Sequence, residues 1–189
     1  MKLNFLLILI FALAFFSCEK DNEENTGLRK NPPKVPRSVT YDLNDDSIDD
    51  IKIEYNDFVW DGDSTSGQMY AGAIETLNEC SVLLKRDEYE LFLESNDTIE
   101  INVNEPFYWE KYTYVDLVTI WNSSANEYLW PNEWKIQSNM IMDFYYVGIK
   151  IKSGDNYFVG WIKLKIDDSN GRIKILNKKF TSEEYIVIG

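Results

Sequence analysis

Ile162-Lys163-Leu164-Lys165-Ile166 is the stretch that decides the fold, because apolar and charged side chains alternate along it without interruption. A period of two places successive side chains on opposite faces of a β-strand, one facing a core and the other facing water. The same alternation occurs at 51–55, 99–103 and 147–151. Strands that are buried on one face only are typical of antiparallel sheets packed face to face. The sequence therefore predicts an all-β fold, an antiparallel β-sandwich.

Turn residues separate the last strands. Ser153-Gly154-Asp155-Asn156 divides two of them, and Ser169-Asn170-Gly171 contains an Asn-Gly pair, which tolerates positive φ at both central positions of a hairpin. We therefore expect a meander in the C-terminal part. Gly160-Trp161 is expected to be a core anchor, with a large ring beside a residue small enough for close approach. Residues 85–94 fit either one short helix or a strand.

The N-terminus has the features of a lipoprotein precursor. Lys2 precedes an apolar run at 3–16 that is shorter than the about 20 residues needed to cross a bilayer. A charged start, a short apolar centre and a small residue before the cut are marks of a secretory signal, and Ser17 is the small residue. Several acyl chains on Cys18 would give a firm membrane anchor. We predict a lipoprotein signal peptide at 1–17 and lipidation of Cys18; the alternative is plain secretion with a free Cys18.

Residues 18–37 are predicted to be a flexible tether, because they contain almost no large apolar side chains and change from acidic to proline-rich. The segment 18–24 resembles the Lys-plus-acid signal of Bacteroidota-type lipoproteins. This resemblance implies an outer-membrane location facing the cell exterior, and the alternative is the periplasmic face. Residues 38–189 are then expected to form a single β-sandwich domain.

Composition restricts the classes of function. The chain has 19 basic and 32 acidic residues, and only Lys2 of these lies within 1–17, so the mature chain carries a formal charge of −14. Such a chain is expected to repel nucleic acid and anionic lipid. The absence of histidine excludes His-dependent triads and His-ligated zinc sites. Once Cys18 is acylated, Cys80 is the remaining thiol and cannot form an intramolecular disulfide.

The acidic stretch 42–50 is the strongest candidate site. Its oxygen-bearing side chains fall at alternating positions, which suits a hard cation that takes six to eight oxygen ligands. Without a cation, each close pair of carboxylates costs about 1 kcal/mol in water at about 4 Å. We therefore predict a structural calcium site. Its predicted ligands are Asp42, Asn44, Asp46, the backbone carbonyl of Ile48, and Asp50. The alternative is an acidic surface turn held by Asx hydrogen bonds.

The same stretch carries a resemblance. It resembles the Asp-x-Asn-x-Asp-Gly-x-x-Asp calcium loops that precede strands, with Ser47 in place of the glycine. It is not an EF-hand, because Ile53 stands where the bidentate Glu is required. Together with Gly160-Trp161-Ile162 near the C-terminal end, it resembles a pattern in uncharacterised Bacteroidota secreted and lipid-anchored proteins. That resemblance implies an all-β sandwich and implies no activity.

Aromatic residues are concentrated between 107 and 134. Exposed Trp and Tyr rings can stack on sugars, but Trp and Tyr are also good strand residues, so we expect most of these rings in the core. Trp130 and Trp134 are the exceptions, because Pro131 biases the chain around them towards a loop. They are the predicted ligand-binding residues of a carbohydrate-binding protein.

These features predict a lipid-anchored outer-membrane surface protein that acts as an extracellular binding module, stabilised by calcium, and not as an enzyme. One alternative is a carbohydrate-binding accessory protein that uses the loop aromatics. Another is a protein-interaction role, which predicts a flat apolar patch. The last is a glycoside hydrolase that uses two carboxylates, for which Asp61, Asp63 and Glu133 could be named only arbitrarily.

Overall fold

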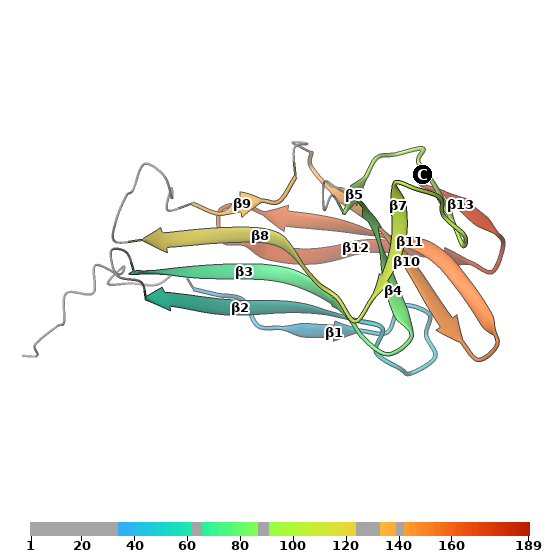
Figure 1. Cartoon of the computed structure of the whole chain (residues 1–189), viewed down its shortest axis with the longest axis horizontal. Helices are drawn as coiled ribbons and strands as arrows, with labels where there is room; N and C mark the ends of the chain where they lie inside the picture. Colours follow the sequence, from blue (N-terminus) through green and yellow to red (C-terminus); the bar gives the residue numbers. More distant parts are fainter. Residues whose placement is uncertain (1–33, 62–65, 87–90, 124–132, 139–141) are drawn as a thin grey trace, which may run out of the picture.

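The computed structural model of the protein describes five stretches of the chain (Figure 1), which are residues 34–61, 66–86, 91–123, 133–138 and 142–189. For residues 60, 61, 66, 122 and 123 it describes the backbone alone. These stretches contain strands joined by turns, with no helix among them. The predicted all-β fold is therefore confirmed, and its antiparallel sheets pack face to face as in a β-sandwich.

Three sheets make up the described fold. The first sheet has the order β1 (Val39–Tyr41), β2 (Ile51–Asp61), β3 (Ser66–Thr76), β8 (Tyr114–Ser123) and β9 (Lys135–Ile136). The second has the order β12 (Arg172–Thr181), β11 (Asn156–Asp167), β10 (Tyr145–Ser153), β4 (Cys80–Lys85) and β7 (Phe107–Lys111), with β5 (Phe92–Leu93) also paired to β10. The third consists of β13 (Tyr185–Val187) and β6 (Thr98–Glu100).

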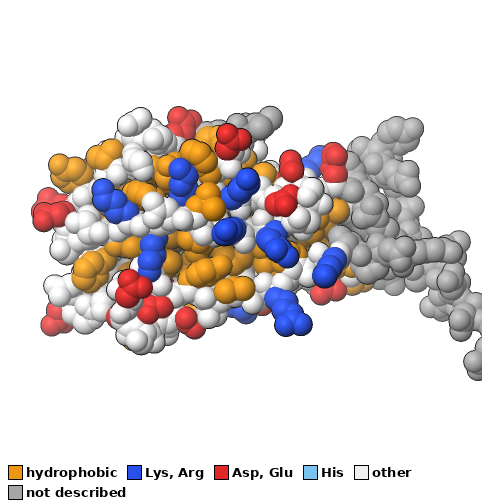
Figure 2. All heavy atoms as spheres, turned by 180° about the vertical axis from the view of Figure 1, so that it is seen from behind, with side chains coloured by type: hydrophobic (Ala, Val, Ile, Leu, Met, Phe, Trp, Pro, Cys, Tyr) orange, Lys and Arg blue, Asp and Glu red, His pale blue; other side chains and the backbone are white. Residues whose placement is uncertain are grey.

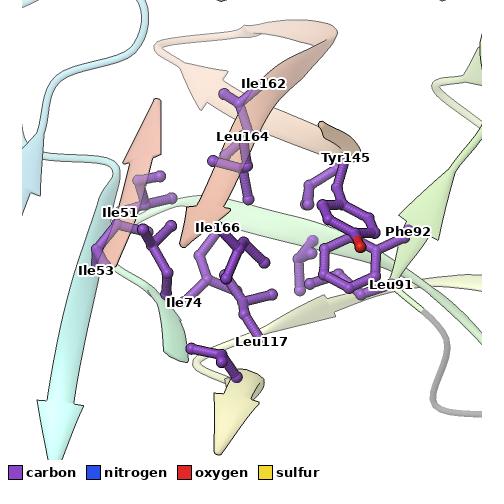
Figure 3. Close-up of a cluster of buried hydrophobic side chains, with 14 of the residues drawn as sticks. Ile51, Ile53, Ile74, Leu91, Phe92, Leu117, Tyr145, Ile162, Leu164 and Ile166 are labelled. Atoms are coloured by element: carbon purple, nitrogen blue, oxygen red, sulfur yellow. The ribbon is translucent and has the colours of Figure 1, made fainter. Parts of the chain in front are cut away.

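The main core lies between the first and second sheets (Figure 3). Alternate residues of β2 point into it, so Ile51 and Ile53 are almost completely buried while Lys52 between them is half-buried. Leu164 of β11 packs into the same core from the other sheet. Each such aliphatic side chain stabilises the fold by about 1.5–3 kcal/mol relative to an exposed one. The alternation in the sequence thus selects the side of each sheet that faces the core.

A second core lies between the outer face of the second sheet and the small third sheet. Trp161 is only 3% exposed there and meets the ring of Tyr146 edge-on, with centroids 5.4 Å apart. A Cβ atom on Gly160 would lie 2.2 Å from the carbonyl oxygen of Lys179, so only glycine allows this approach of β11 to β12. The core-anchor interpretation of Gly160-Trp161 is confirmed.

The predicted meander is confirmed by the consecutive antiparallel strands β10, β11 and β12. The two-residue Asn-Gly hairpin is wrong, because the connection spans 168–171 and only Gly171 has a positive φ there, of 70°. Asp167 accounts for the longer turn, since its carboxylate accepts hydrogen bonds from Ser169 and Asn170.

Two further expectations need adjustment. The strand expected at 99–103 ends at Glu100, because its partner strand β13 is only three residues long. Within the ambiguous segment 85–94, residues 92–93 form the short strand β5, while 87–90 lie outside the described residues. At the start of the described chain, Val35 of the predicted tether packs against the main core.

Candidate functional site

The acidic loop lies between β1 and β2 and folds back on itself through side-chain to backbone hydrogen bonds. The Asp42 carboxylate accepts bonds from the backbone N–H groups of Asp46 (3.2 Å) and Ser47 (2.7 Å). Asp50, at the end of the loop, accepts a bond from the N–H of Leu43 at 2.7 Å. Desolvation acts to raise the pKa of Asp42, but the loop N–H groups, first that of Ser47, outweigh it, so the pKa is lowered.

Two residues of this loop have left-handed backbone conformations. Asp45 has a φ of 63° and Ser47 a φ of 70°. Side chains with a Cβ atom adopt this region rarely, whereas glycine adopts it readily. Ser47 occupies the position of the glycine in the calcium loops that the sequence resembles, and it adopts a left-handed conformation that glycine would adopt more readily.

Negative charge in the loop is offset only in part. Asp50 is 3% exposed, and burial raises the pKa of its carboxyl, as do the charges of Asp46 and Asp42 to a smaller extent. Lys178 of β12 reaches the loop, where its Nζ lies 3.1 Å from both the Asp42 carbonyl oxygen and the Asp45 carboxylate. Among the described residues, one lysine is therefore seen to pair with a loop that contains five aspartates.

The structure places the predicted calcium ligands, which are Asp42, Asn44, Asp46, Ile48 and Asp50, in one short loop. Their oxygens are engaged in internal bonds: Asp46 accepts from the Ile48 N–H at 2.9 Å and from the Asn44 amide at 2.9 Å. Among the residues described, no group of three or more acidic or cysteine side chains is arranged to hold a metal ion. The donor set suits calcium and equally an Asx-bonded turn, so calcium stays a prediction.

The two predicted stacking rings have different outcomes. Trp130 lies outside the described residues. Trp134 is 7% exposed and packs against Gly171, where an added Cβ atom would come within 2.6 Å of its ring. A ring buried in this way offers no face on which a sugar could stack. Of the other aromatics in this region, Phe107 is 37% and Tyr112 is 74% exposed.

A furrow of about 500 Å³ lies instead beside β7. We call it the aromatic furrow, and it is lined by residues 101–105, residues 107–109 and Lys150. The chain leaves β6, passes through a cis Glu105–Pro106 bond and returns as β7. As a result, the side chains that follow β6 face those of β7 across the furrow. The furrow is a shallow hollow that is widely open to solvent, in contrast to an enclosed cavity.

Hydrogen bonds fix one wall of the aromatic furrow. The indole Nε1 of Trp109 donates to the carbonyl oxygens of Ile101 (3.0 Å) and Glu100 (3.3 Å), which sets the position of its ring. At the rim, the carboxylate of Glu105 pairs with Arg86 at 3.0 Å. Phe107, Tyr108 and Trp109 are each partly accessible to solvent. The furrow therefore combines held aromatic rings with a paired acidic group.

Lys150 of β10 contributes the basic group of the furrow. Its Nζ donates to the Ile101 carbonyl oxygen at 3.3 Å and lies 4.9 Å from the centroid of the Trp109 ring and 5.9 Å from that of Tyr157. Burial lowers the pKa of Lys150, and the positive charge of Lys111 lowers it further. The ammonium is thus partly removed from water and held against two rings.

Sequence reasoning missed Lys150, Asn102 and Asn104. Lys150 alternates with buried isoleucines and therefore has the pattern of any solvent-facing strand residue. The available signal was the polar Asn102-Val103-Asn104-Glu105-Pro106 segment, whose amides and proline indicate a loop directly before three consecutive aromatic residues. Only the pairing of distant strands brings this loop to Lys150.

The negative charge of the chain is unevenly distributed. Figure 2 shows a face on which Lys and Arg side chains gather among apolar ones. The strands β10, β11 and β12 contain a single acidic residue, Asp167, and many basic ones, which are Lys150, Lys152, Lys163, Lys165, Arg172, Lys174, Lys178 and Lys179. An anionic ligand would therefore meet a local field opposite in sign to the net charge.

A second hollow of about 450 Å³ lies where the end of the tether meets β1 and β2, lined among others by Arg37, Tyr41, Tyr55 and Arg172.

No helix in the described part of the chain has the length and apolarity needed to cross a bilayer. Comparison with protein-family models, with curated proteins and with solved structures found no match to this chain. The proposal of a function therefore depends on the geometry of the sites described above.

Proposed function

We propose that this protein is a lipid-anchored extracellular binding module that binds a carbohydrate in the aromatic furrow and catalyses no reaction. The aromatic furrow is the observation that carries the proposal. The anchor rests on the sequence at 1–18, which lies outside the described residues, and places the module on the outer membrane. The acidic loop, with a calcium ion bound, serves stability and takes no part in binding.

The lining of the furrow favours a sugar over a protein partner. Sugar rings present apolar C–H faces that pack on aromatic rings and hydroxyls that bond to amides, and the furrow offers Trp109 and Phe107 together with Asn102 and Asn104. A protein partner would favour a flat apolar patch in place of a hollow. The geometry therefore supports the carbohydrate-binding alternative, with its site moved from Trp134 to β7.

Glycan-array binding by the purified full-length protein tests this function. Trp109→Ala and Phe107→Ala should each weaken the strongest signals at least about tenfold, because aromatic contacts contribute about 0.5–1.5 kcal/mol beyond their buried area. Phe58→Ala is the matched control, since Phe58 is 45% exposed on β2 and does not line the furrow. An array with no binding, or binding that is the same in all three variants, would contradict the proposal.

The anchor has its own test. Intact-mass analysis of the protein from its native membrane should show Cys18 as the first residue, carrying acyl chains. An unmodified Cys18, or a mature chain that lacks it, would remove the membrane location and leave the furrow hypothesis standing.

A further inference from the structure

The environment of Lys150 differs from that of the lysines for which an ion pair is described. Lys52, Lys111 and Lys178 each contact a carboxylate. Lys150 has none in the described structure, where its neighbours are one carbonyl oxygen and the faces of two rings. An ammonium group has three donors, and the Ile101 carbonyl accepts from only one of them. The group therefore keeps donors for a ligand in the furrow that it lines.

We propose that the aromatic furrow binds a sugar that carries a carboxylate, such as a hexuronate, and that Lys150 pairs with this carboxylate. The inference rests on the proposed carbohydrate-binding function and narrows its ligand class. The sugar ring packs on the aromatic wall, and its hydroxyls bond to the amides of Asn102 and Asn104. The carboxylate gives the partly desolvated ammonium the anionic partner that the described part of the protein does not supply.

The other charges around the furrow are compatible with an anionic ligand. Glu105 is the acidic residue in its lining, and it is paired with Arg86, so its charge is locally offset. Lys111 lies near enough to Lys150 to lower its pKa, but Lys111 is itself paired with Glu79, so the positive charge in the furrow lining is that of Lys150. The net negative charge of the chain acts mainly over longer distances and is screened beyond about 8–10 Å in physiological salt. Short acidic oligosaccharides are therefore favoured over long polyanions.

The test uses pairs of sugars that differ only in the carboxylate. Galacturonate and glucuronate tri- and tetrasaccharides are compared with their carboxyl-reduced counterparts by isothermal titration calorimetry on the full-length protein in non-ionic detergent. The wild type should bind the acidic form about tenfold more tightly, which corresponds to 1.4 kcal/mol. Lys150→Met should abolish this preference, and Lys150→Arg should retain most of it.

Lys163→Met is the matched control. Its Nζ also lies over an aromatic ring, 3.4 Å from the centroid of Phe144, and it does not line the furrow. This variant should keep the tenfold preference. A melting curve for each variant establishes that it is folded.

The outcomes separate the inference from the function on which it rests. Equal affinity for acidic and reduced sugars, still weakened by Trp109→Ala, overturns the role of Lys150 and leaves the binding function in place. A preference that survives in Lys150→Met also overturns it. No binding of any of these sugars, or binding that Trp109→Ala leaves unchanged, overturns both.

Discussion

If the acidic loop binds calcium as we propose, removal of the ion should destabilise the folded protein by an amount that its Kd determines. Asp42, Asp46 and Asp50 lie in one turn, and Asp50 is buried, so the folded state concentrates negative charge that the unfolded chain disperses. A cation that binds only the folded state stabilises it by RT ln(1 + [Ca²⁺]/Kd). With an extracellular-type Kd of about 10⁻⁴–10⁻³ M, a tenfold excess contributes about 1.4 kcal/mol.

The assay is a thermal melt in chelator and in 5 mM calcium at matched ionic strength, with magnesium as the competing cation. For a domain of this size, 1.4 kcal/mol corresponds to a rise of about 2–4 °C in Tm. Magnesium should have a smaller effect, because it dehydrates reluctantly and demands octahedral geometry. Identical Tm values in chelator and calcium would refute the calcium site and leave the Asx-bonded turn as the complete description of the loop.

A substitution in the loop tests the charge repulsion and the calcium site together. Asp46→Asn retains an oxygen to accept from Ile48 but removes one charge next to Asp42 and Asp50. It also replaces the oxygen that accepts from the Asn44 amide and the Ser153 hydroxyl, so the two effects oppose each other in chelator and Tm should change little there. The calcium increment should be abolished. Asp155→Asn, in the exposed turn between β10 and β11, is the control and should leave both quantities unchanged.

Three further predictions concern the scaffold. Gly160→Ala should destabilise the fold by about 3 kcal/mol in urea unfolding, because the added Cβ atom would collide with a backbone oxygen. In the control Gly154→Ala the added Cβ atom meets no neighbour, so only the positive φ destabilises the fold, by about 1 kcal/mol. Burial raises the pKa of Asp116 above its ordinary 3.8, so ionisation of this carboxyl destabilises the fold as pH rises. Asp116→Asn should therefore stabilise the fold by about 1 kcal/mol at pH 7 but not below about pH 3.8. An equal gain in stability at both pH values would contradict this reasoning. Cys80 is fully buried, and burial raises its pKa, so a thiol reagent should label it only at the rate of unfolding; rapid native labelling would show that β4 opens locally.

The sequence was sufficient for the fold because one physical rule determines it. Alternation at 51–55 and 162–166 requires that one face be buried, and two such sheets can bury their faces only against each other. Local turn chemistry was less reliable: Asn170-Gly171 suggests a two-residue hairpin, but the side chain of Asp167 organises a longer turn. A side chain that bonds to nearby backbone competes with the preferred turn type.

The site could be predicted only where its residues are close in sequence. The acidic loop is a continuous segment, and its backbone turn was expected in the place where the structure has it. Trp134 has a loop setting in the sequence, yet it is buried, because Gly171 lacks the Cβ atom that would exclude the ring. Lys150 and Ile101 are 49 residues apart, and their contact depends on the register of two sheets. No local pattern contains that information.

The acidic loop also connects the two main sheets. It follows β1 of the first sheet, but Lys178 of β12 and Ser153 of β10 contact it from the second, with the Ser153 hydroxyl 3.2 Å from the Asp46 carboxylate. A cation in the loop would therefore tighten the junction between the sheets. Lys150 precedes Ser153 by three residues, so it lies on the opposite face of β10, and the register of that strand with β11 holds from Tyr145 to Ser153. Because β10 is fixed in this way, calcium would act on the stability of the sandwich while the position of the ammonium in the furrow stays the same.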